Sequence, residues 1–109
     1  MSDVDLSLTP NQEVILSALR FRNRYGLEIM EAIEKSGGKS IRFNSLYPNL
    51  KKLEKKGFVK SKWGDEAPEQ HTGARRKYYQ ITGTGIKALE VKQQLLANVA
   101  HWIPKPEGI

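Results

Sequence analysis

The stretch Asn44-Ser-Leu-Tyr-Pro-Asn-Leu-Lys-Lys-Leu-Glu-Lys-Lys-Gly-Phe58 decides the fold. At about 100° per residue, Leu46, Leu50 and Leu53 fall on one narrow side of a helix. Phe58 and Val59 extend this apolar stripe beyond the helix end. The spacing therefore predicts a helix that packs by one side and leaves the other side in solvent.

The ends of this helix are marked by residue types that favour helix termini. Asn44 or Ser45 is suited to the N-cap, which places Pro48 in the first turn, where a proline costs little. Gly57 supplies the left-handed residue that ends a helix.

The solvent side of the predicted helix carries short polar groups first and ammonium groups later. Its members are Asn44, Pro48, Lys51, Lys52 and Lys55, with Ser45 and Lys56 on the flank. Residues 39–63 hold eight lysines and arginines against one acidic residue, so most of the net charge of +6 gathers here. Such a block is usually a solvated face, but it also suits an anionic partner such as nucleic acid.

Length and composition restrict the class of protein. The chain has 109 residues, enough for one domain with its own core, and no cysteine, so it has no disulfide framework and no thiolate metal site. Asp3 and Asp5 stand where a signal peptide needs positive charge, and no apolar run is long enough for a membrane span. We expect a cytoplasmic protein with no membrane contact.

Two shorter helices are predicted before the lysine-rich helix. The first begins at the cap Thr9-Pro10 and ends near Phe21, and the second runs from about Tyr25 to Ser36, where Gly37-Gly38 closes it. The residues expected to point inward are Val14, Ile15, Ala18 and Leu19 in the first helix and Leu27, Ile29, Met30 and Ile33 in the second. Residues 39–43 suit a short strand or an extended link. Three helices with a basic third one follow the order of a helix-turn-helix.

After Gly57 the apolar residues alternate, which is typical of strands. Residues 58–63 and 77–81 predict a hairpin with a long loop, or wing, which carries Asp65, Glu66 and Glu69 on its outgoing arm. The fold class is therefore α+β, mostly α: a winged helix-turn-helix of three helices and a two-stranded wing.

A long C-terminal helix is predicted from Thr84 to Ile103. Its apolar residues form two stripes, one with Ile86, Leu89, Leu96, Ala100 and Ile103, the other with Ala88, Val91, Leu95, Val99 and Trp102. One stripe can cover its own domain and the other a second chain, although both could be buried in one monomer. The expected organisation is a flexible tail (1–8), the winged helix (9–82), a dimerisation helix (83–103) and a second tail (104–109).

Three segments resemble one known family. The segments are Tyr25-Gly-Leu-Glu-Ile, Ser45-Leu-Tyr-Pro-Asn-Leu-Lys-Lys-Leu-Glu-Lys-Lys-Gly-Phe and Arg75-Arg-Lys-Tyr-Tyr-Gln-Ile-Thr-Gly-Thr-Gly. Over about residues 10–100 the chain resembles the PadR family of bacterial transcriptional regulators, in its short type with one C-terminal helix. The acidic wing arm is similar to that of cyanobacterial members. The resemblance implies a homodimeric winged helix, usually a repressor, that binds double-stranded DNA.

The candidate contacts with DNA lie on the third helix and the wing. Residues near the helix N-terminus are expected to meet base edges and the lysines to meet phosphates of an inverted-repeat operator. The wing residues suit the DNA backbone or the minor groove, and the Tyr47 hydroxyl either reaches a phosphate or its ring packs on the second helix. The predicted DNA-binding residues are Asn44, Ser45, Tyr47, Pro48, Lys51, Lys52, Lys55, Arg75, Arg76 and Lys77; the predicted dimer interface is Leu89, Leu95, Leu96, Val99 and Trp102.

Other classes of function find little support in the sequence. There is no phosphate-loop glycine pattern and no nucleophile with a base, so no catalytic residue or cofactor is predicted. His71 and His101 have no neighbours at metal-ligand spacing, so no metal site is predicted. In some relatives aromatic residues of the dimer-forming helix contact flat aromatic compounds, but a tryptophan such as Trp102 is more often plain packing, and no effector is assigned. The remaining alternative is a winged helix that binds another protein, or RNA, and uses its lysines only for solubility.

Overall fold

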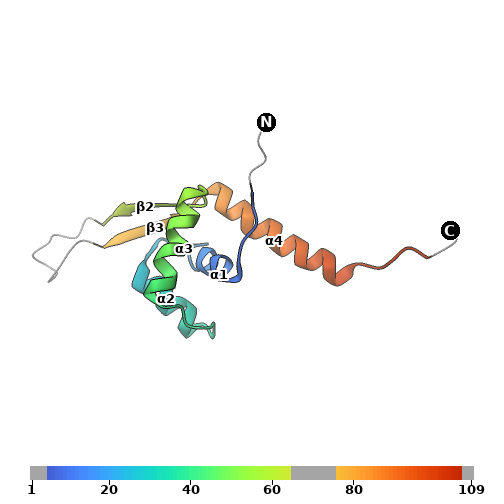
Figure 1. Ribbon diagram of the computed structural model, residues 1–109, viewed down its shortest axis with the longest axis horizontal. Helices are drawn as coiled ribbons and strands as arrows, with labels where there is room; N and C mark the ends of the chain where they lie inside the picture. Colours follow the sequence, from blue (N-terminus) through green and yellow to red (C-terminus); the bar gives the residue numbers. More distant parts are fainter. Residues whose placement is uncertain (1–4, 65–75, 107–109) are drawn as a thin grey trace, which may run out of the picture.

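The computed structural model describes residues 5–64 and 76–106. The elements, in chain order, are α1 (Pro10–Ala18), β1 (Arg24–Tyr25), α2 (Gly26–Lys35), α3 (Phe43–Lys55), β2 (Val59–Trp63), β3 (Lys77–Ile81) and α4 (Gly83–His101). The first three helices and the strands form one unit, and α4 leaves it on the side opposite the wing (Figure 1). The α+β winged-helix class is confirmed.

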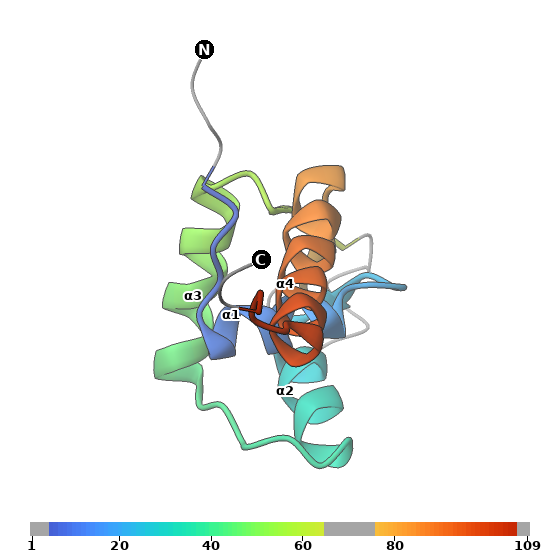
Figure 2. The same cartoon turned by 90° about the vertical axis from the view of Figure 1, so that its right-hand side faces the viewer.

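The core lies among the four helices, with α1 at the centre. Helix α1 packs against α2, α3 and α4, and Figure 2 shows it between the other helices. Leu46, Leu50 and Leu53 are fully buried, as the apolar spacing predicts, and Phe58 closes the core after Gly57. Gly57 has φ +81°, so it ends α3 in the left-handed region as expected.

Helix α1 begins as predicted and ends earlier than predicted. The Thr9 hydroxyl accepts a hydrogen bond from the Gln12 amide at 3.2 Å, and the Gln12 side chain accepts one from the Thr9 amide at 3.1 Å, a reciprocal capping box. The helix ends at Ala18, not near Phe21, because Arg24 Nε donates to the Ala18 carbonyl at 2.7 Å. Phe21 is left 90% exposed in the following turn.

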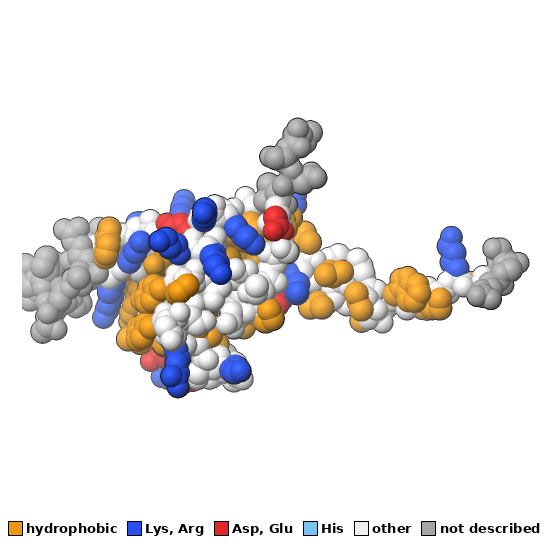
Figure 3. Space-filling model, viewed as in Figure 1, with side chains coloured by type: hydrophobic (Ala, Val, Ile, Leu, Met, Phe, Trp, Pro, Cys, Tyr) orange, Lys and Arg blue, Asp and Glu red, His pale blue; other side chains and the backbone are white. Residues whose placement is uncertain are grey.

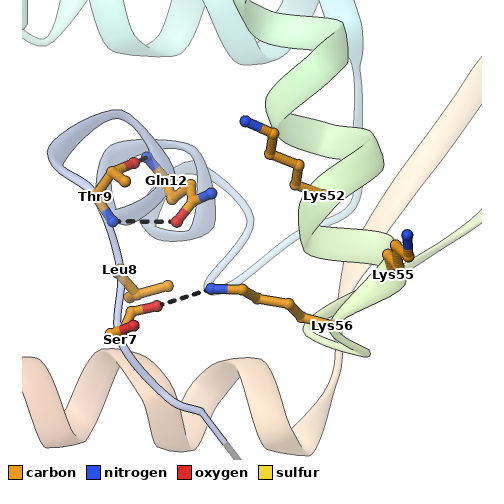
Figure 4. A pocket seen from close by; sticks show the side chains of 7 residues that line it. All are labelled: Ser7, Leu8, Thr9, Gln12, Lys52, Lys55 and Lys56. Atoms are coloured by element: carbon orange, nitrogen blue, oxygen red, sulfur yellow. Dashed lines mark hydrogen bonds between the residues drawn. The ribbon is translucent and has the colours of Figure 1, made fainter.

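Residues 5–8 do not form part of a free tail, so the prediction of a tail over 1–8 is wrong for them. Leu8 is buried in the core, and Lys56 Nζ donates to the Ser7 carbonyl at 3.2 Å (Figure 4). The Ser7 hydroxyl and amide both donate to Asp5, and these hydrogen bonds hold the pKa of the Asp5 carboxyl below its usual range. The segment is attached to the end of α3 through one lysine.

Helix α3 begins earlier than its polar residues suggest: it starts at Phe43, with Arg42 as the N-cap, and neither Asn44 nor Ser45 is the cap. The Arg42 carbonyl accepts from the Ser45 and Leu46 amides at 3.0 and 2.8 Å, which begins the helix there. Pro48 therefore lies in the helix interior, beyond the first turn. A proline cannot donate to the Asn44 carbonyl, but Asn44 and Pro48 are both on the exposed side, where water can take the place of that helical bond.

The sheet has three strands in the order β1-β3-β2, one more than the predicted hairpin. The hairpin itself is confirmed: Val59 pairs with Ile81 and Trp63 with Lys77, antiparallel. The added strand is only two residues long and pairs Arg24 with Tyr79 and Tyr25 with Tyr78. The acidic arm of the wing, with Asp65, Glu66 and Glu69, lies outside the described residues.

Helix α2 follows the prediction except at its start. Ile29 and Ile33 are buried, and Gly37, with φ +92°, follows the helix end. Leu27 was expected to point inward but is 55% exposed, because the first turn of α2 faces the groove beside the wing rather than the core.

Helix α4 is capped by Thr82, whose hydroxyl accepts from the Gly85 amide at 3.1 Å and donates to the Gly57 carbonyl at 2.6 Å. Only its first third is buried, through Gly85, Ala88 and Leu89. The prediction that one apolar stripe of the helix is covered by the domain and the other is not is wrong. Both stripes are covered by the domain near the start of α4, and both are exposed toward its C-terminal end. Leu89, predicted at the dimer interface, lies in the protomer's own core at 3% exposure.

Membrane-spanning helices and metal-binding clusters are both absent from residues 5–64 and 76–106. No helix among them is long and apolar enough to cross a bilayer. No cluster of three or more histidine, cysteine or acidic side chains in this part of the chain is placed to hold a metal ion.

Candidate nucleic-acid interface

The exposed side of α3 gathers the predicted helix residues on one surface. Lysine and arginine side chains lie over α3 and the base of the wing in Figure 3. The predicted residues of α3 whose side chains are exposed are Asn44, Tyr47, Pro48, Lys51, Lys52 and Lys55. The three buried leucines hold the opposite side of α3 against the core, so this side faces solvent.

The lysines on this surface differ from Lys35 and Lys56, which lie close to acidic side chains. Lys35 pairs with Glu31 at 3.6 Å, and Lys56 lies 4.0 Å from Asp5. Within residues 5–64 and 76–106, Lys51, Lys52 and Lys55 form no ion pair. Their charge is not neutralised by an acidic neighbour in this part of the chain, so it is available to an anion.

The single acidic residue of α3, Glu54, is hydrogen-bonded to the wing strand β2. Ser61 Oγ of β2 donates to Glu54 at 2.8 Å. This hydrogen bond ties the carboxylate to the wing strand and reduces its repulsion of an anion that approaches the lysines.

Ser45 is placed differently from the other predicted contacts. It is half-buried, and its hydroxyl accepts from Asn11 Nδ2 at 3.5 Å, while its carbonyl accepts from Asn49 Nδ2 at 2.9 Å. The residue therefore lies toward α1, at the edge of the exposed surface rather than at its centre.

Tyr47 takes the second of its two expected positions, packed on α2. Its hydroxyl end lies directly over Gly26, where a Cβ would collide with the ring. Its ring stacks on Phe43 with centroids 5.8 Å apart and planes inclined by 8°. With 43% of the side chain exposed, the outer edge of the ring still reaches the surface of α3.

Two of the predicted wing residues, Arg76 and Lys77, lie against aromatic rings. The Arg76 guanidinium lies 4.5 Å from the centre of the Tyr25 ring, and Lys77 Nζ lies 5.8 and 5.9 Å from the Trp63 and Tyr79 rings. Arg75 lies outside the described residues. Burial raises the pKa of the Tyr79 phenol, so this hydroxyl stays protonated at neutral pH.

A groove between α3, the start of α2 and the wing brings in residues that the sequence analysis did not assign to the site. This aromatic groove has a volume of about 570 Å³, and its walls include Leu27, Phe43, Tyr47, Trp63, Arg76 and Lys77. Phe43 was assigned to a link and Leu27 to the core. The spacing of four residues from Phe43 to Tyr47 was the available signal, since it places two aromatic rings on one side of a helix.

The outer part of α4 exposes a second, apolar surface. Leu95 and Leu96 are about half exposed, and Val99 and Trp102 more so, at 66% and 72%. Among the predicted interface residues, these four lie on the surface and only Leu89 does not. Figure 3 shows hydrophobic side chains along this helix, away from the basic side chains that gather over α3.

Comparison with known proteins identifies relatives. Residues 15–91 match the family described as the transcriptional regulator PadR-like family. A PadR family transcription regulator from Clostridium difficile is 31% identical, with a TM-score of 0.69 over 82% of this chain and 88% of that one. A transcriptional regulator from Clostridium thermocellum is 33% identical, with a TM-score of 0.64 over 82% and 86%.

A third solved structure is a complex with DNA. Bacillus subtilis PadR, solved in complex with operator DNA, is 25% identical, with a TM-score of 0.61 over 94% of this chain and 54% of that one. The comparison with curated protein sequences gives no match.

Proposed function

This chain belongs to the PadR-like family of transcriptional regulators, and from that premise we propose that it is a homodimeric repressor that reads an inverted-repeat operator with α3. Membership makes it a DNA-binding transcriptional regulator. The proposal adds which surfaces are used, that two copies act together and that binding silences the gene. The last point follows from the usual role of the family.

The observation that carries the proposal is the exposed side of α3. Three lysines without ion pairs among the described residues follow two exposed positions, Asn44 and Pro48, near the helix start. A helix that enters the major groove presents its N-terminal residues to base edges. In this arrangement Asn44 contacts a base, Lys51, Lys52 and Lys55 contact phosphates, and Ser45 supports the helix from its α1 side.

The wing and the Tyr47 ring are proposed to contact the backbone next to the helix. Arg76 and Lys77 lie where β3 begins, at the loop end of the paired strands, with their charged groups over aromatic rings that limit their movement. Guanidinium and ammonium groups so held lose less rotamer entropy when they bind phosphate. Arg75 is included as the preceding residue of the same basic run.

The second copy is proposed to cover the outer part of α4. Leu95, Leu96, Val99 and Trp102 expose apolar surface that a solvated monomer would leave in water. A two-fold dimer through this helix would direct two α3 helices to half-sites about one turn, or roughly 10 base pairs, apart.

The experiment is selection of bound duplexes from a random pool, followed by titration of the enriched duplex at several salt concentrations. We expect an inverted repeat to be enriched. In a plot of log affinity against log salt concentration, each phosphate contact should make the slope more negative by about 0.9. Absence of enrichment, together with salt-insensitive binding, would contradict the proposal and favour a protein-binding adaptor.

A further inference from the structure

The aromatic groove exposes apolar side chains on the same side of the molecule as the lysines. Leu27, Phe43 and Trp63 are each more than half exposed, at 55%, 51% and 56%, and Tyr47 is 43% exposed. Hydrophobic side chains gather beside the basic ones at this place in Figure 3. Clustered apolar exposure marks a contact surface, and phosphate contacts by lysines make no use of it.

The groove presents one ring in a defined position. Phe43 is the first residue of α3 and lies outside the core, so the core does not require its bulk. Its ring stacks on Tyr47, and Tyr47 is in turn seated on Gly26, which has no side chain to displace it. An aromatic ring is therefore held at the helix start, beside Asn44, with its outer half in solvent.

The positive charges around the groove restrict the kind of molecule that can bind in it. Arg76 and Lys77 stand on one wall, and Lys51 follows one turn beyond Tyr47 along α3. A partner must therefore bring both negative charge and an apolar group. In the major groove of DNA the apolar group is the C5-methyl of thymine, and phenylalanine is among the side chains that contact it.

We propose that Phe43, backed by Tyr47, reads thymine methyl groups, so that each operator half-site contains a thymine needed for its methyl. The inference rests on the proposed function, because it requires α3 to lie in the major groove. Phe43 thereby becomes a specificity-determining residue next to Asn44, with a contact that depends on shape and not on hydrogen bonding.

The test replaces thymine by deoxyuridine, one position at a time, in the selected duplex. Uracil keeps the hydrogen-bonding edge of thymine and lacks only the methyl. For the wild-type protein we expect roughly fourfold weaker binding at one thymine of a half-site, and roughly fifteenfold weaker binding when both half-sites are changed. Phe43→Ala should bind the thymine and uracil duplexes equally.

A control variant separates loss of the methyl contact from a general loss of DNA affinity. Lys51→Ala should weaken binding to both duplexes and keep their ratio. Circular dichroism and thermal melting of Phe43→Ala check its fold, and the wild-type comparison needs no variant at all.

Each contrary outcome overturns a stated claim. Equal affinity of the wild type for thymine and uracil at every position overturns the methyl contact and leaves the operator proposal standing. A ratio that survives in Phe43→Ala assigns the methyl to another residue and also overturns it. If no duplex is enriched, the methyl contact and the proposed function fail together.

Discussion

The exposed side of α3 and the outer part of α4 are both open surfaces, but they differ in chemistry. Away from the aromatic groove, Asn44 and the three lysines of α3 expose an amide and ammonium ions, which water solvates well, so their exposure has little cost. On α4 and the two residues that follow it the exposed groups are large apolar side chains, from Val91 at 44% to Ile103 at 81% exposure. The difference is the basis of the proposal that α3 exchanges water and counterions for DNA, whereas α4 is covered by the apolar surface of a second copy.

The two surfaces are joined by a short, rigid junction. Thr82 caps α4 and also donates to the carbonyl of Gly57, the residue that ends α3. The Thr82 amide donates to the Phe58 carbonyl at 2.9 Å. Because these bonds fix where α4 starts relative to α3, an arrangement of two α4 helices would also fix the spacing of two α3 helices.

The largest effect is expected from a charge on the apolar surface of α4. Leu96→Glu should raise the dimer dissociation constant at least about a hundredfold, because each of two carboxylates would lose more than about 2 kcal/mol of hydration. Sedimentation at micromolar concentration should then show monomer, and operator affinity should fall with it. Gln94→Glu, on the polar side of the same helix, is the control and should stay dimeric. A dimeric Leu96→Glu protein would place the interface elsewhere.

Next in size is a change at the junction. In Gly85→Ala the new Cβ would collide with the Phe58 carbonyl, and backbone yields little. We expect the free energy of unfolding to fall by about 2–4 kcal/mol, measured by urea denaturation. Gly83→Ala is the control, since nothing lies within 4 Å of a Cβ there. Equal stability of the two variants would mean that the junction adjusts freely.

Removing positive charge from α3 should have a smaller effect, but one that extends to every DNA sequence. Changing Lys51 and Lys52 to Ala together should weaken binding to all DNA sequences. The log–log salt slope should fall by about 0.9 for each phosphate that is no longer neutralised, or about 3.6 for the four lysines of a dimer. Lys35→Ala, whose ammonium pairs with Glu31, should leave the slope unchanged. An unaltered slope in the double variant would show that these lysines do not touch DNA.

The smallest effect is expected from a change at Gly26, against which the Tyr47 ring packs. Gly26→Ala should push the Tyr47 ring off α2 and disturb its stacking on Phe43, because the new Cβ occupies the place of the hydroxyl end. We expect operator affinity to fall roughly threefold, about the value of one displaced apolar group, with the free energy of unfolding within about 1 kcal/mol of wild type. Fluorescence titration and urea denaturation measure the two quantities. Unchanged affinity would show that the Tyr47 ring takes no part in binding.

Much of the local structure could be predicted because it depends on near neighbours. The capping box at Thr9, the left-handed Gly57 and the spacing of the α3 leucines each act within a few residues, so the sequence shows them directly. The same periodicity predicted which side of α3 is exposed. The start of α3 was placed too late because polar residues at Asn44 and Ser45 suit a cap, while the actual cap at Arg42 uses only its backbone.

The errors elsewhere concern contacts between distant segments. Arg24 ends α1 from six residues away, β1 forms only because β3 is beside it, and Leu27 is exposed because α2 starts at a groove. None of these has a local pattern. The aromatic groove was missed for the same reason, since its walls come from separate elements that only the fold brings together.

The amino-acid pattern alone predicts the order of the helices and of the wing hairpin, the apolar and cationic sides of α3 and the apolar character of α4, because helical and strand periodicity place side chains relative to their own backbone. Only the tertiary structure decided how far along α4 the domain's cover reaches. The core has room for Ala88 and Leu89 and ends there, so the same apolar pattern is core at the base of the helix and open surface beyond it.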